Sequence, residues 1–312
     1  LAVDFFFLLS GFVINYAYHD RWNKMTTVSF FKRRLIRLHP MLIMGAFIGL
    51  ICFLIGGSMQ WSGNTIPFYI SIITFLLTCF MIPALPGSFN EVRGNGELFP
   101  LNGPMWSLFF EYIGNILYAL FIRRLSTKLL TLLVILLGIL HSIFTIGNLS
   151  GYGNLGVGWT FDTINFCGGM LRMLFPFTLG MLISRCFKAI KLPYPFFLSS
   201  ILLIATLSVP YLPAFKAINL NGIYESLCII AIFPLILIIG ASNQEKSKLS
   251  QTLGELSYPL YIIHYPIMYL FYQWLIKTKQ YTLSQTYPVA ILVVLLSVIL
   301  AFTLSRLYDK PI

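Results

Sequence analysis

The sequence predicts an all-α membrane protein that crosses the bilayer many times, and three observations support this. Hydrophobic residues make up 58% of the 312 residues and charged residues only 10%, whereas a soluble globular domain carries about 25% charged residues. Apolar runs of roughly 20 residues, the length that a helix needs to cross a bilayer, recur along the whole chain. Lys and Arg gather in some of the connections between these runs, as in the cytoplasmic loops of membrane proteins.

The apolar runs define the elements that we expect, in chain order. They lie at residues 1–18, 40–57, 66–86, 105–122, 129–147, 166–185, 196–213, 222–242, 256–276 and 287–306. Because the connections between them are short, we expect a single transmembrane domain over residues 1–312.

Basic residues assign the connections to the two sides of the membrane. The connections at 19–39 and 123–128 are rich in Lys and Arg, so both are predicted to be cytoplasmic. Three runs lie between them, and three crossings would put them on opposite sides. We therefore expect the run at 66–86, whose end contains two prolines, to re-enter or break. About nine crossings remain, and a helix upstream of Leu1 would complete a bundle of ten.

Four ionisable residues lie inside apolar runs: Asp4, Glu111, Arg172 and His264. A charge at the centre of a membrane helix costs at least ~2.5–3.5 kcal/mol and usually has a function. The predicted topology places all four in the outer half of the membrane or near its midplane. We therefore expect them to contribute to one polar site.

Glu111 belongs to a polar stripe on one helical face. Ser107, Glu111, Asn115 and Tyr118 follow one another at intervals of three to four residues, so they share a face. In a membrane this face must look into the bundle or into a wet cavity. The stripe indicates a functional site, and the alternative is a ladder of interhelical hydrogen bonds without chemistry.

His264 shares a face with Ser257 and Tyr261, and prolines on either side of it predict a kinked helix. A lone histidine of this kind is either a ligand-contacting residue or a satisfied core residue. Asp4 shares a face with Gly11 and is either buried or interfacial.

Arg172 lies beside two glycines and has the charge to neutralise either Glu111 or Asp4. Arg33, Arg34 and Arg37 are spaced so that a helix would bring their guanidinium groups together. Arginine forks match phosphate oxygens. The alternative is a cytoplasmic anchor that binds lipid headgroups.

The sequence lacks the motifs of several other kinds of functional site. The five Cys residues show no CxxC spacing, and no Walker loop, GxSxG, HExxH or GxGxxG motif occurs. These absences argue against ATP-driven transport and against hydrolase chemistry of the soluble type. The net charge of +11 is explained by the cytoplasmic loops, so we expect no nucleic-acid partner. The Cys spacing gives no reason to expect a metal site.

Four separated blocks give the chain a family resemblance. Residues 3–12 read VDFFFLLSGF, residues 31–40 read FKRRLIRLHP, residues 104–111 read PMWSLFFE and residues 256–266 read LSYPLYIIHYP. In this order they resemble the V-D-x-F-F-x-x-S-G-F, R-x-x-R, W-S-L-x-x-E and S-Y-x-x-Y-x-x-H-x-P motifs of acyltransferase family 3, a family of integral-membrane O-acyltransferases.

The resemblance implies a ten-helix bundle in a bacterial inner membrane. It implies transfer of an acyl group, usually acetyl, from cytoplasmic acyl-CoA to a hydroxyl of a glycan or lipid-linked saccharide. The implied roles are catalytic for Glu111, His264 and Asp4, and CoA-binding for Arg33, Arg34 and Arg37. Substrate binding is implied for Trp106, Ser107, Asn115, Arg172 and Tyr261, and a structural role for Ser10, Gly11, Ser257 and Tyr258. Trp106 has a second interpretation, as an anchor at the membrane interface.

One departure from the family pattern affects the catalytic assignment. Family members carry an Arg and, about ten residues later, a catalytic His on the helix before the V-D-x-F-F motif, whereas Leu1 stands at the start of that motif. We expect a truncated N-terminus and an upstream helix that supplies both residues. Two other readings remain, a carrier of saccharide or acyl groups and an inactive relative of the enzymes.

Overall fold

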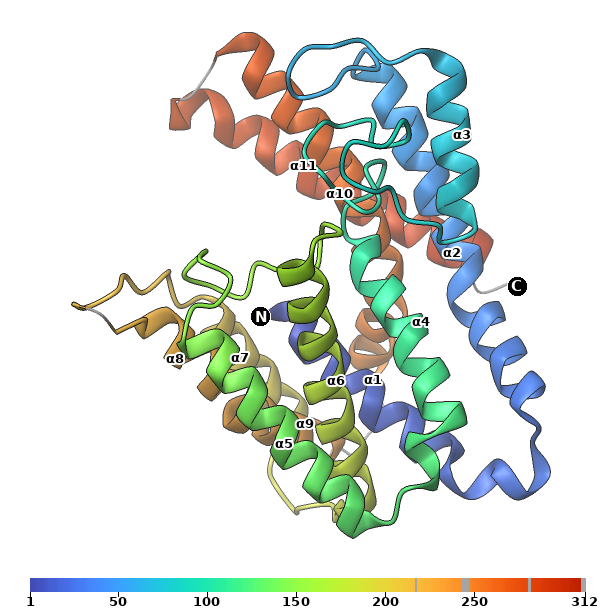
Figure 1. Cartoon of the computed structure of the whole chain (residues 1–312), viewed down its shortest axis with the longest axis vertical. Coiled ribbons are helices and arrows are strands. Elements are labelled where there is room, and N and C mark those ends of the chain that lie inside the picture. The colour runs from blue at the N-terminus through green and yellow to red at the C-terminus, as the bar shows by residue number, and fades with distance from the viewer. Residues whose placement is uncertain (217, 243–246, 280–281, 310–312) are drawn as a thin grey trace. The chain divides into compact units, whose positions relative to one another are not determined.

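The computed structural model describes residues 1–216, 218–242, 247–279 and 282–309. Across these ranges the regular elements are helices and no strand forms (Figure 1). The prediction of an all-α membrane protein is therefore confirmed.

The long helices follow the predicted apolar runs. They are α1 (Ala2–Tyr18), α2 (Thr27–Ile55), α3 (Phe68–Cys79), α4 (Met105–Leu120), α5 (Thr127–Ile146), α6 (Thr163–Cys186), α7 (Pro195–Leu207), α8 (Leu220–Leu227), α9 (Phe233–Ala241), α10 (Lys248–Thr278) and α11 (Leu283–Leu304). The run at 222–242 is divided by a π-helical turn, Cys228–Ile232, between α8 and α9.

Among the residues that the structure describes, six helical segments are long and apolar enough to cross a membrane by length and composition. They are Thr27–Ile55, Met105–Arg124, Thr127–Ile146, Thr163–Cys186, Leu220–Ala241 and Leu283–Asp309. The run predicted not to cross contains α3, whose 12 residues extend only about 18 Å at 1.5 Å per residue, against a hydrocarbon core of about 30 Å. The count of nine crossings stays a prediction.

The start of α2 differs from the sequence-based boundary. The predicted span begins at Pro40, whereas α2 begins at Thr27 and contains the basic residues 32–37 as well as Pro40. The helix starts early because the Thr26 hydroxyl accepts a hydrogen bond from the Ser29 amide at 3.1 Å, which caps its first turn. Lys and Arg are good helix formers, and a membrane helix tolerates an interior proline.

The described helices belong to two compact units. Unit 1 comprises Leu1–Phe31, Phe109–Gly158 and Asp162–Lys246, and unit 2 comprises Lys32–Leu108, Trp159–Phe161 and Ser247–Ile312. The single domain expected over residues 1–312 stays a prediction, and each unit is described by itself below.

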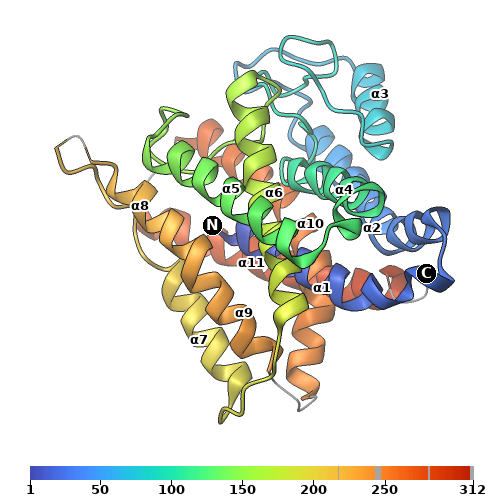
Figure 2. The same cartoon turned by 60° about the horizontal axis from the view of Figure 1, so that its bottom comes forward.

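In unit 1, α1 runs along α6 (Figure 1). Glycines on both helices allow this close approach, because a Cβ atom at Gly11 would lie 1.9 Å from the Phe177 carbonyl oxygen and one at Gly180 would lie 2.0 Å from the Leu8 carbonyl oxygen. Small residues at the contact are the usual way in which membrane helices pack. The helix α5 also packs on α6 and α8, and α7 lies beside α9 (Figure 2).

In unit 2, the helix α10 packs along α11. One apolar cluster is built on Met41, Ile263 and Ala301. A second cluster joins Leu50 and Phe53 of α2 to Val92 and Leu101, which lie in the irregular segment between α3 and α4. This segment is therefore part of the core of unit 2 rather than a solvated loop.

The glycine contact predicts a strong effect of Gly180→Val. The added side chain would collide with backbone atoms, which cannot move aside as a flexible side chain would, so we expect a loss of about 3 kcal/mol or more in unfolding free energy. Thermal unfolding in detergent, followed by circular dichroism, measures it. The matched control is Gly254→Val, because a Cβ at Gly254 meets no atom within 4 Å. Equal unfolding midpoints for the two variants would contradict the packing argument.

Candidate functional site

A buried ion pair joins α1 to α6 in unit 1. The Arg172 guanidinium donates from Nε to Asp4 Oδ1 and from Nη2 to Asp4 Oδ2, both at 2.9 Å. Its Nη1 donates to the Val157 carbonyl oxygen at 2.8 Å. Asp4 is 0% exposed and Arg172 5% exposed. The pair is the bidentate arrangement in which arginine binds carboxylate most strongly.

This pair decides two alternatives left by the sequence. Arg172 pairs with Asp4, one of the two carboxylates that the sequence offered it, and Asp4 is buried rather than interfacial. Asn15, on the face of α1 that it shares with Asp4, donates to the Ser184 hydroxyl of α6 at 3.1 Å. Because both Asp4 oxygens accept from Arg172, the geometry favours an organising role for this carboxylate.

Glu111 meets α1 through a different residue. The Ser10 hydroxyl donates to Glu111 Oε1 at 2.9 Å, and both side chains are half-buried. The two adjacent motif residues of α1 therefore contact different helices: Ser10 contacts α4 and Gly11 contacts α6. The carboxylate of Glu111 is held in a defined direction by this hydroxyl.

The polar stripe of α4 continues into the interior of unit 1. Asn115 is 1% exposed, and neither atom of its amide has a hydrogen-bond partner among the described residues. Tyr118 is 0% exposed, and its hydroxyl accepts from the Trp22 indole at 3.2 Å. Buried amides nearly always find partners, so the Asn115 amide indicates a place for a water molecule or a ligand hydroxyl.

His141 on α5 is an ionisable residue that the sequence reasoning missed. It is 0% exposed, and within the described ranges neither ring nitrogen has a hydrogen-bond partner. Its ring lies 5.3 Å from that of Phe175, and Asp4 and Arg172 are close enough to act on it electrostatically. The signal was available, because His141 lies inside an apolar run as Glu111 does.

In unit 2 the start of α4 carries a pair of hydroxyl groups. The hydroxyls of Ser107 and Tyr261 lie 2.6 Å apart, and each oxygen lies 3.0 Å from the Pro104 carbonyl oxygen. Each hydroxyl has one proton, so one hydroxyl donates to the other, which in turn donates to the carbonyl oxygen. Trp106, which comes directly before Ser107 in the chain, is half-buried. Ser107 and Tyr261, which the sequence placed among the substrate-binding residues, are therefore in direct contact.

The proton position on His264 follows from its hydrogen bonds. Its Nδ1 lies 2.9 Å from the Tyr261 carbonyl oxygen and 3.1 Å from that of Leu260. Because a carbonyl oxygen only accepts, Nδ1 must carry the proton, and the lone pair of the neutral ring is on Nε2. The ring is half-buried between those of Tyr261 and Tyr265.

The prolines of α10 release two backbone carbonyls that other residues bind. Pro266 has no N–H, so the Ile262 carbonyl oxygen has no partner within the helix, and Asn102 donates to it at 2.8 Å. Pro259 likewise frees the Glu255 carbonyl oxygen, and the Ser305 hydroxyl of the turn after α11 lies 3.5 Å from it.

The remaining motif residues of α10 contribute structure. Ser257 is exposed and its hydroxyl donates to the Gly254 carbonyl oxygen at 2.8 Å. The Tyr258 hydroxyl donates to the Leu38 carbonyl oxygen of α2 at 2.6 Å. Tyr258 therefore ties α10 to the turn of α2 that follows the basic residues.

The basic residues of the second motif lie on the N-terminal half of α2. Arg33 and Arg37 are exposed and Arg34 is half-buried. Arg37 lies within electrostatic reach of Asp309, at the end of the described chain. The helix places Arg37 one turn from both Arg33 and Arg34, so the three guanidinium groups can approach one anion.

The segment between α3 and α4 holds two buried ionisable residues that the sequence reasoning did not single out. Arg93 is 0% exposed and Glu97 9% exposed. Burial lowers the pKa of Arg93 and raises the pKa of Glu97, since it disfavours the charged form of each. The sequence analysis did not identify Arg93 as a buried residue, because basic residues in the connections were used only to assign sides of the membrane.

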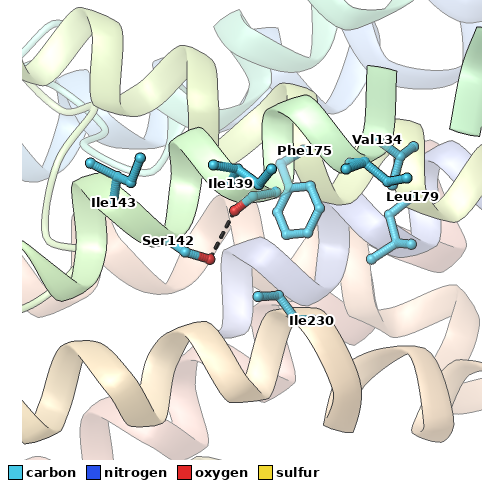
Figure 3. Close-up of a pocket in the computed structure, with 9 residues that line it drawn as sticks. Val134, Ile139, Ser142, Ile143, Phe175, Leu179 and Ile230 are labelled. Carbon is cyan, nitrogen blue, oxygen red and sulfur yellow. Dashed lines mark hydrogen bonds between the residues drawn. The ribbon is translucent and has the colours of Figure 1, made fainter. Parts of the chain in front are cut away.

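An apolar groove of about 440 Å³ lies against α5 in unit 1 (Figure 3). Its lining includes Ile139, Phe175 and Ile230, and its one hydroxyl, on Ser142, donates to the Gly138 carbonyl oxygen. The groove therefore offers no polar group for catalysis. In the part of the chain that the structure describes, no three His, Cys, Asp or Glu side chains gather as a metal site would require.

The predicted site residues thus form two sets. Unit 1 holds Asp4, Ser10, Gly11, Glu111, Asn115 and Arg172, and unit 2 holds Arg33, Arg34, Arg37, Trp106, Ser107, Ser257, Tyr258, Tyr261 and His264. Within unit 1 the contacts are Asp4–Arg172 and Ser10–Glu111, and within unit 2 the contact is Ser107–Tyr261. One polar site formed by Asp4, Glu111, Arg172 and His264 stays a prediction.

Comparisons with known proteins add a family context. A family model described as an acyltransferase domain (Acyl_transf_3) matches residues 1–306, which include the four sequence blocks. The curated "Protein 2 in picA locus" of Rhizobium radiobacter is 35% identical over 141 residues, covering 41% of this chain and 69% of that protein. No solved structure gives a significant match.

The buried ion pair makes a prediction about stability. Asp4→Asn removes the carboxylate charge that the buried Arg172 binds, so we expect it to lower the free energy of unfolding by about 3–5 kcal/mol. The double variant Asp4→Leu/Arg172→Met removes both charges and should be more stable than the single one. Unfolding of the detergent-solubilised chain by SDS measures all three. The control is Asp20→Asn, because Asp20 is exposed. A double variant less stable than Asp4→Asn would refute the explanation by unpaired charge.

Proposed function

This chain belongs to acyltransferase family 3, and from that premise we propose that it moves an acetyl group from cytoplasmic acetyl-CoA to a hydroxyl of a saccharide or lipid-linked saccharide. Membership and the apolar helices support a multi-pass membrane acyltransferase. The structural observation that carries the finer proposal is the Glu111 carboxylate, held inside unit 1 by the Ser10 hydroxyl.

The reaction sets three chemical requirements. The acceptor oxygen forms a bond to the thioester carbonyl carbon, the carbon–sulfur bond breaks, and CoA leaves as a thiol that takes up the proton of the acceptor. The hydroxyl needs a base, the oxyanion needs hydrogen-bond donors, and donor and acceptor must be held together. CoA supplies the activated acyl group, so the proposal uses no metal.

We assign the handling of the acceptor hydroxyl in unit 1 to Glu111. Ser10 fixes the direction of its carboxylate, and a carboxylate so oriented can accept the hydroxyl proton. The unpaired amide of Asn115, one turn further along α4, supports a ligand hydroxyl in this interior. The pair of Asp4 and Arg172 holds α1 and α6 in register beside it.

In unit 2 we assign acceptor binding to Trp106, Ser107 and Tyr261, and a second base to His264. His264 is held in the tautomer with its proton on Nδ1, so the lone pair on Nε2 is free to accept a proton. The paired hydroxyls of Ser107 and Tyr261 suit a hydroxyl-rich ligand, and the indole of Trp106 suits a sugar face.

We assign the CoA phosphates to Arg33, Arg34 and Arg37 on α2. The exposure of Arg33 and Arg37 and the helical spacing of all three support binding of a multivalent anion. The predicted cytoplasmic side is where acyl-CoA is found, and a bacterial inner membrane is the location that we propose.

A second candidate function is a carrier that moves a saccharide or acyl group without chemistry. The unpaired Asn115 amide inside the bundle and the short helix α3 favour it, because transporters use interior polar sites and interrupted helices. The product distinguishes the two functions, since an acyltransferase leaves an alkali-labile ester and a carrier does not.

The catalytic proposal is tested by Glu111→Gln. Membranes of the native host that contain the chain are supplied with radiolabelled acetyl-CoA, and label released by mild alkali is counted. We expect the variant to lose about 10²–10⁴-fold in rate, the usual contribution of a positioned acid or base. Asp20→Asn, an exposed carboxylate, is the control. Full activity in Glu111→Gln would exclude the assigned role.

The CoA assignment is tested by the double variant Arg34→Gln/Arg37→Gln. Each lost charge-assisted hydrogen bond contributes about 1.5–3 kcal/mol, so we expect KM for acetyl-CoA to rise at least about tenfold with little change in kcat. Lys32→Gln, also exposed on α2, is the control. An unchanged KM together with weaker binding to anionic lipid vesicles would instead identify these arginines as a headgroup anchor.

A further inference from the structure

A cage of aromatic rings surrounds Arg93 in unit 2. The guanidinium carbon lies 4.1 Å from the centre of the Tyr269 ring, 4.8 Å from that of Phe53 and 5.1 Å from that of Trp61. Its Nε donates to the Pro100 carbonyl oxygen at 3.0 Å. Arg93 thereby connects α2 and α10 to the chain segment that leads into α4.

Tyr269 of α10 makes two contacts at once. Its ring lies under Arg93, and its hydroxyl donates to Glu97 Oε2. The other oxygen of Glu97 accepts from Asn95 at 2.9 Å. We call Arg93, Glu97 and Tyr269 the Arg93 clamp.

The segment held by the clamp ends at the proposed acceptor-binding residues. Asn102 donates to the Ile262 carbonyl oxygen of α10, and the Tyr261 hydroxyl oxygen lies 3.0 Å from the Pro104 carbonyl oxygen. Gly103 lies so close to α10 that a Cβ there would be 2.7 Å from the Tyr269 hydroxyl. Residues 93–104 are therefore fastened to α10 at Tyr269, Ile262 and Tyr261, and the last contact includes Ser107.

Burying charged side chains to fix a segment costs desolvation free energy. Apolar residues of similar volume usually give equal or greater stability, but they lack direction. The hydrogen bonds from Arg93 Nε to Pro100 and from Tyr269 to Glu97 fix both distance and orientation. The register of residues 93–104 on α10 sets where α4 begins, and hence where Trp106 and Ser107 lie relative to Tyr261.

We propose that Arg93, Glu97 and Tyr269 are positioning residues that fix the acceptor-binding group of Trp106, Ser107 and Tyr261. This rests on the proposed function, in which that group binds the acceptor. The clamp touches neither donor nor acceptor. Loosening it is expected to weaken acceptor binding and to leave acetyl-CoA binding unchanged.

The physical part of the proposal is tested without activity. Tyr269→Phe removes the hydroxyl and keeps the ring under Arg93. We expect hydrogen–deuterium exchange of peptides from residues 93–104 to become at least tenfold faster, while peptides of α11 are unchanged. Tyr272→Phe is the matched control, because Tyr272 lies on α10 and is 37% exposed. Unchanged exchange in Tyr269→Phe and in Arg93→Met would overturn the clamp.

The functional part is tested by steady-state transfer of radiolabelled acetyl in nanodiscs. The acceptor probe is the total saccharide–lipid extract of the native host envelope, varied at fixed acetyl-CoA and then held fixed. For Tyr269→Phe we expect apparent KM for the extract to rise about tenfold, as the loss of one hydrogen bond to a charged group predicts. KM for acetyl-CoA should stay within twofold. Arg93→Lys, which keeps the charge, should lie between the wild type and Arg93→Met.

The outcomes separate the two proposals. A wild-type chain that transfers no alkali-labile acetyl overturns the proposed function and the acceptor role of the clamp with it. An active wild type whose KM for the extract is the same in Tyr269→Phe and Arg93→Met overturns the positioning role alone. A fall in kcat with both KM values unchanged identifies the cluster as merely structural, and this also overturns it.

Discussion

Hydrocarbon offers no hydrogen-bond partner, and this constraint governs where polar groups lie in both units. A polar atom inside the membrane that meets neither water nor a ligand needs a partner within the protein. Asp4 meets this demand through the fork of Arg172. The carbonyl oxygen that Pro266 releases meets it through Asn102, a residue far away in the sequence. Each partnership fastens two segments together, so the satisfaction of polar groups also specifies the packing.

Small residues work together with these partnerships. Gly11 and Gly180 let the backbones of α1 and α6 come so close that no side chain would fit between them. The same pair of helices carries Asp4 and Arg172. The close approach of the two helices brings the Asp4 and Arg172 side chains within hydrogen-bonding distance. The ion pair in turn fixes the register in which the glycines meet. The two features are therefore best understood as one contact.

The sequence predicted the elements of the fold well, because ~20-residue apolar runs have few alternatives in a membrane. It predicted that Ser107, Asn115 and Tyr118 would face inward, and all three are buried. The choice of partners was harder. Arg172 had two carboxylates to choose from, and only three-dimensional packing decides between them. The start of α2 was missed, because the Thr26 cap outweighed the interruption suggested by Pro40. Arg93 was not singled out, since its burial depends on residues distant in the sequence. His141 was overlooked, although its place inside an apolar run was visible in the sequence.

The hydrogen bond from His264 Nδ1 to its own helix has a mechanical consequence. The carbonyls that it uses belong to Leu260 and Tyr261, in the turn just before the one in which Pro266 removes a backbone hydrogen bond of α10. Bending α10 at this turn would change the distances from the imidazole to both carbonyls, and with them the ring's orientation and the preference for its tautomer. A change in helix curvature is thereby translated into a change in where a proton resides, so α10 is a part of the molecule through which movement and basicity are linked.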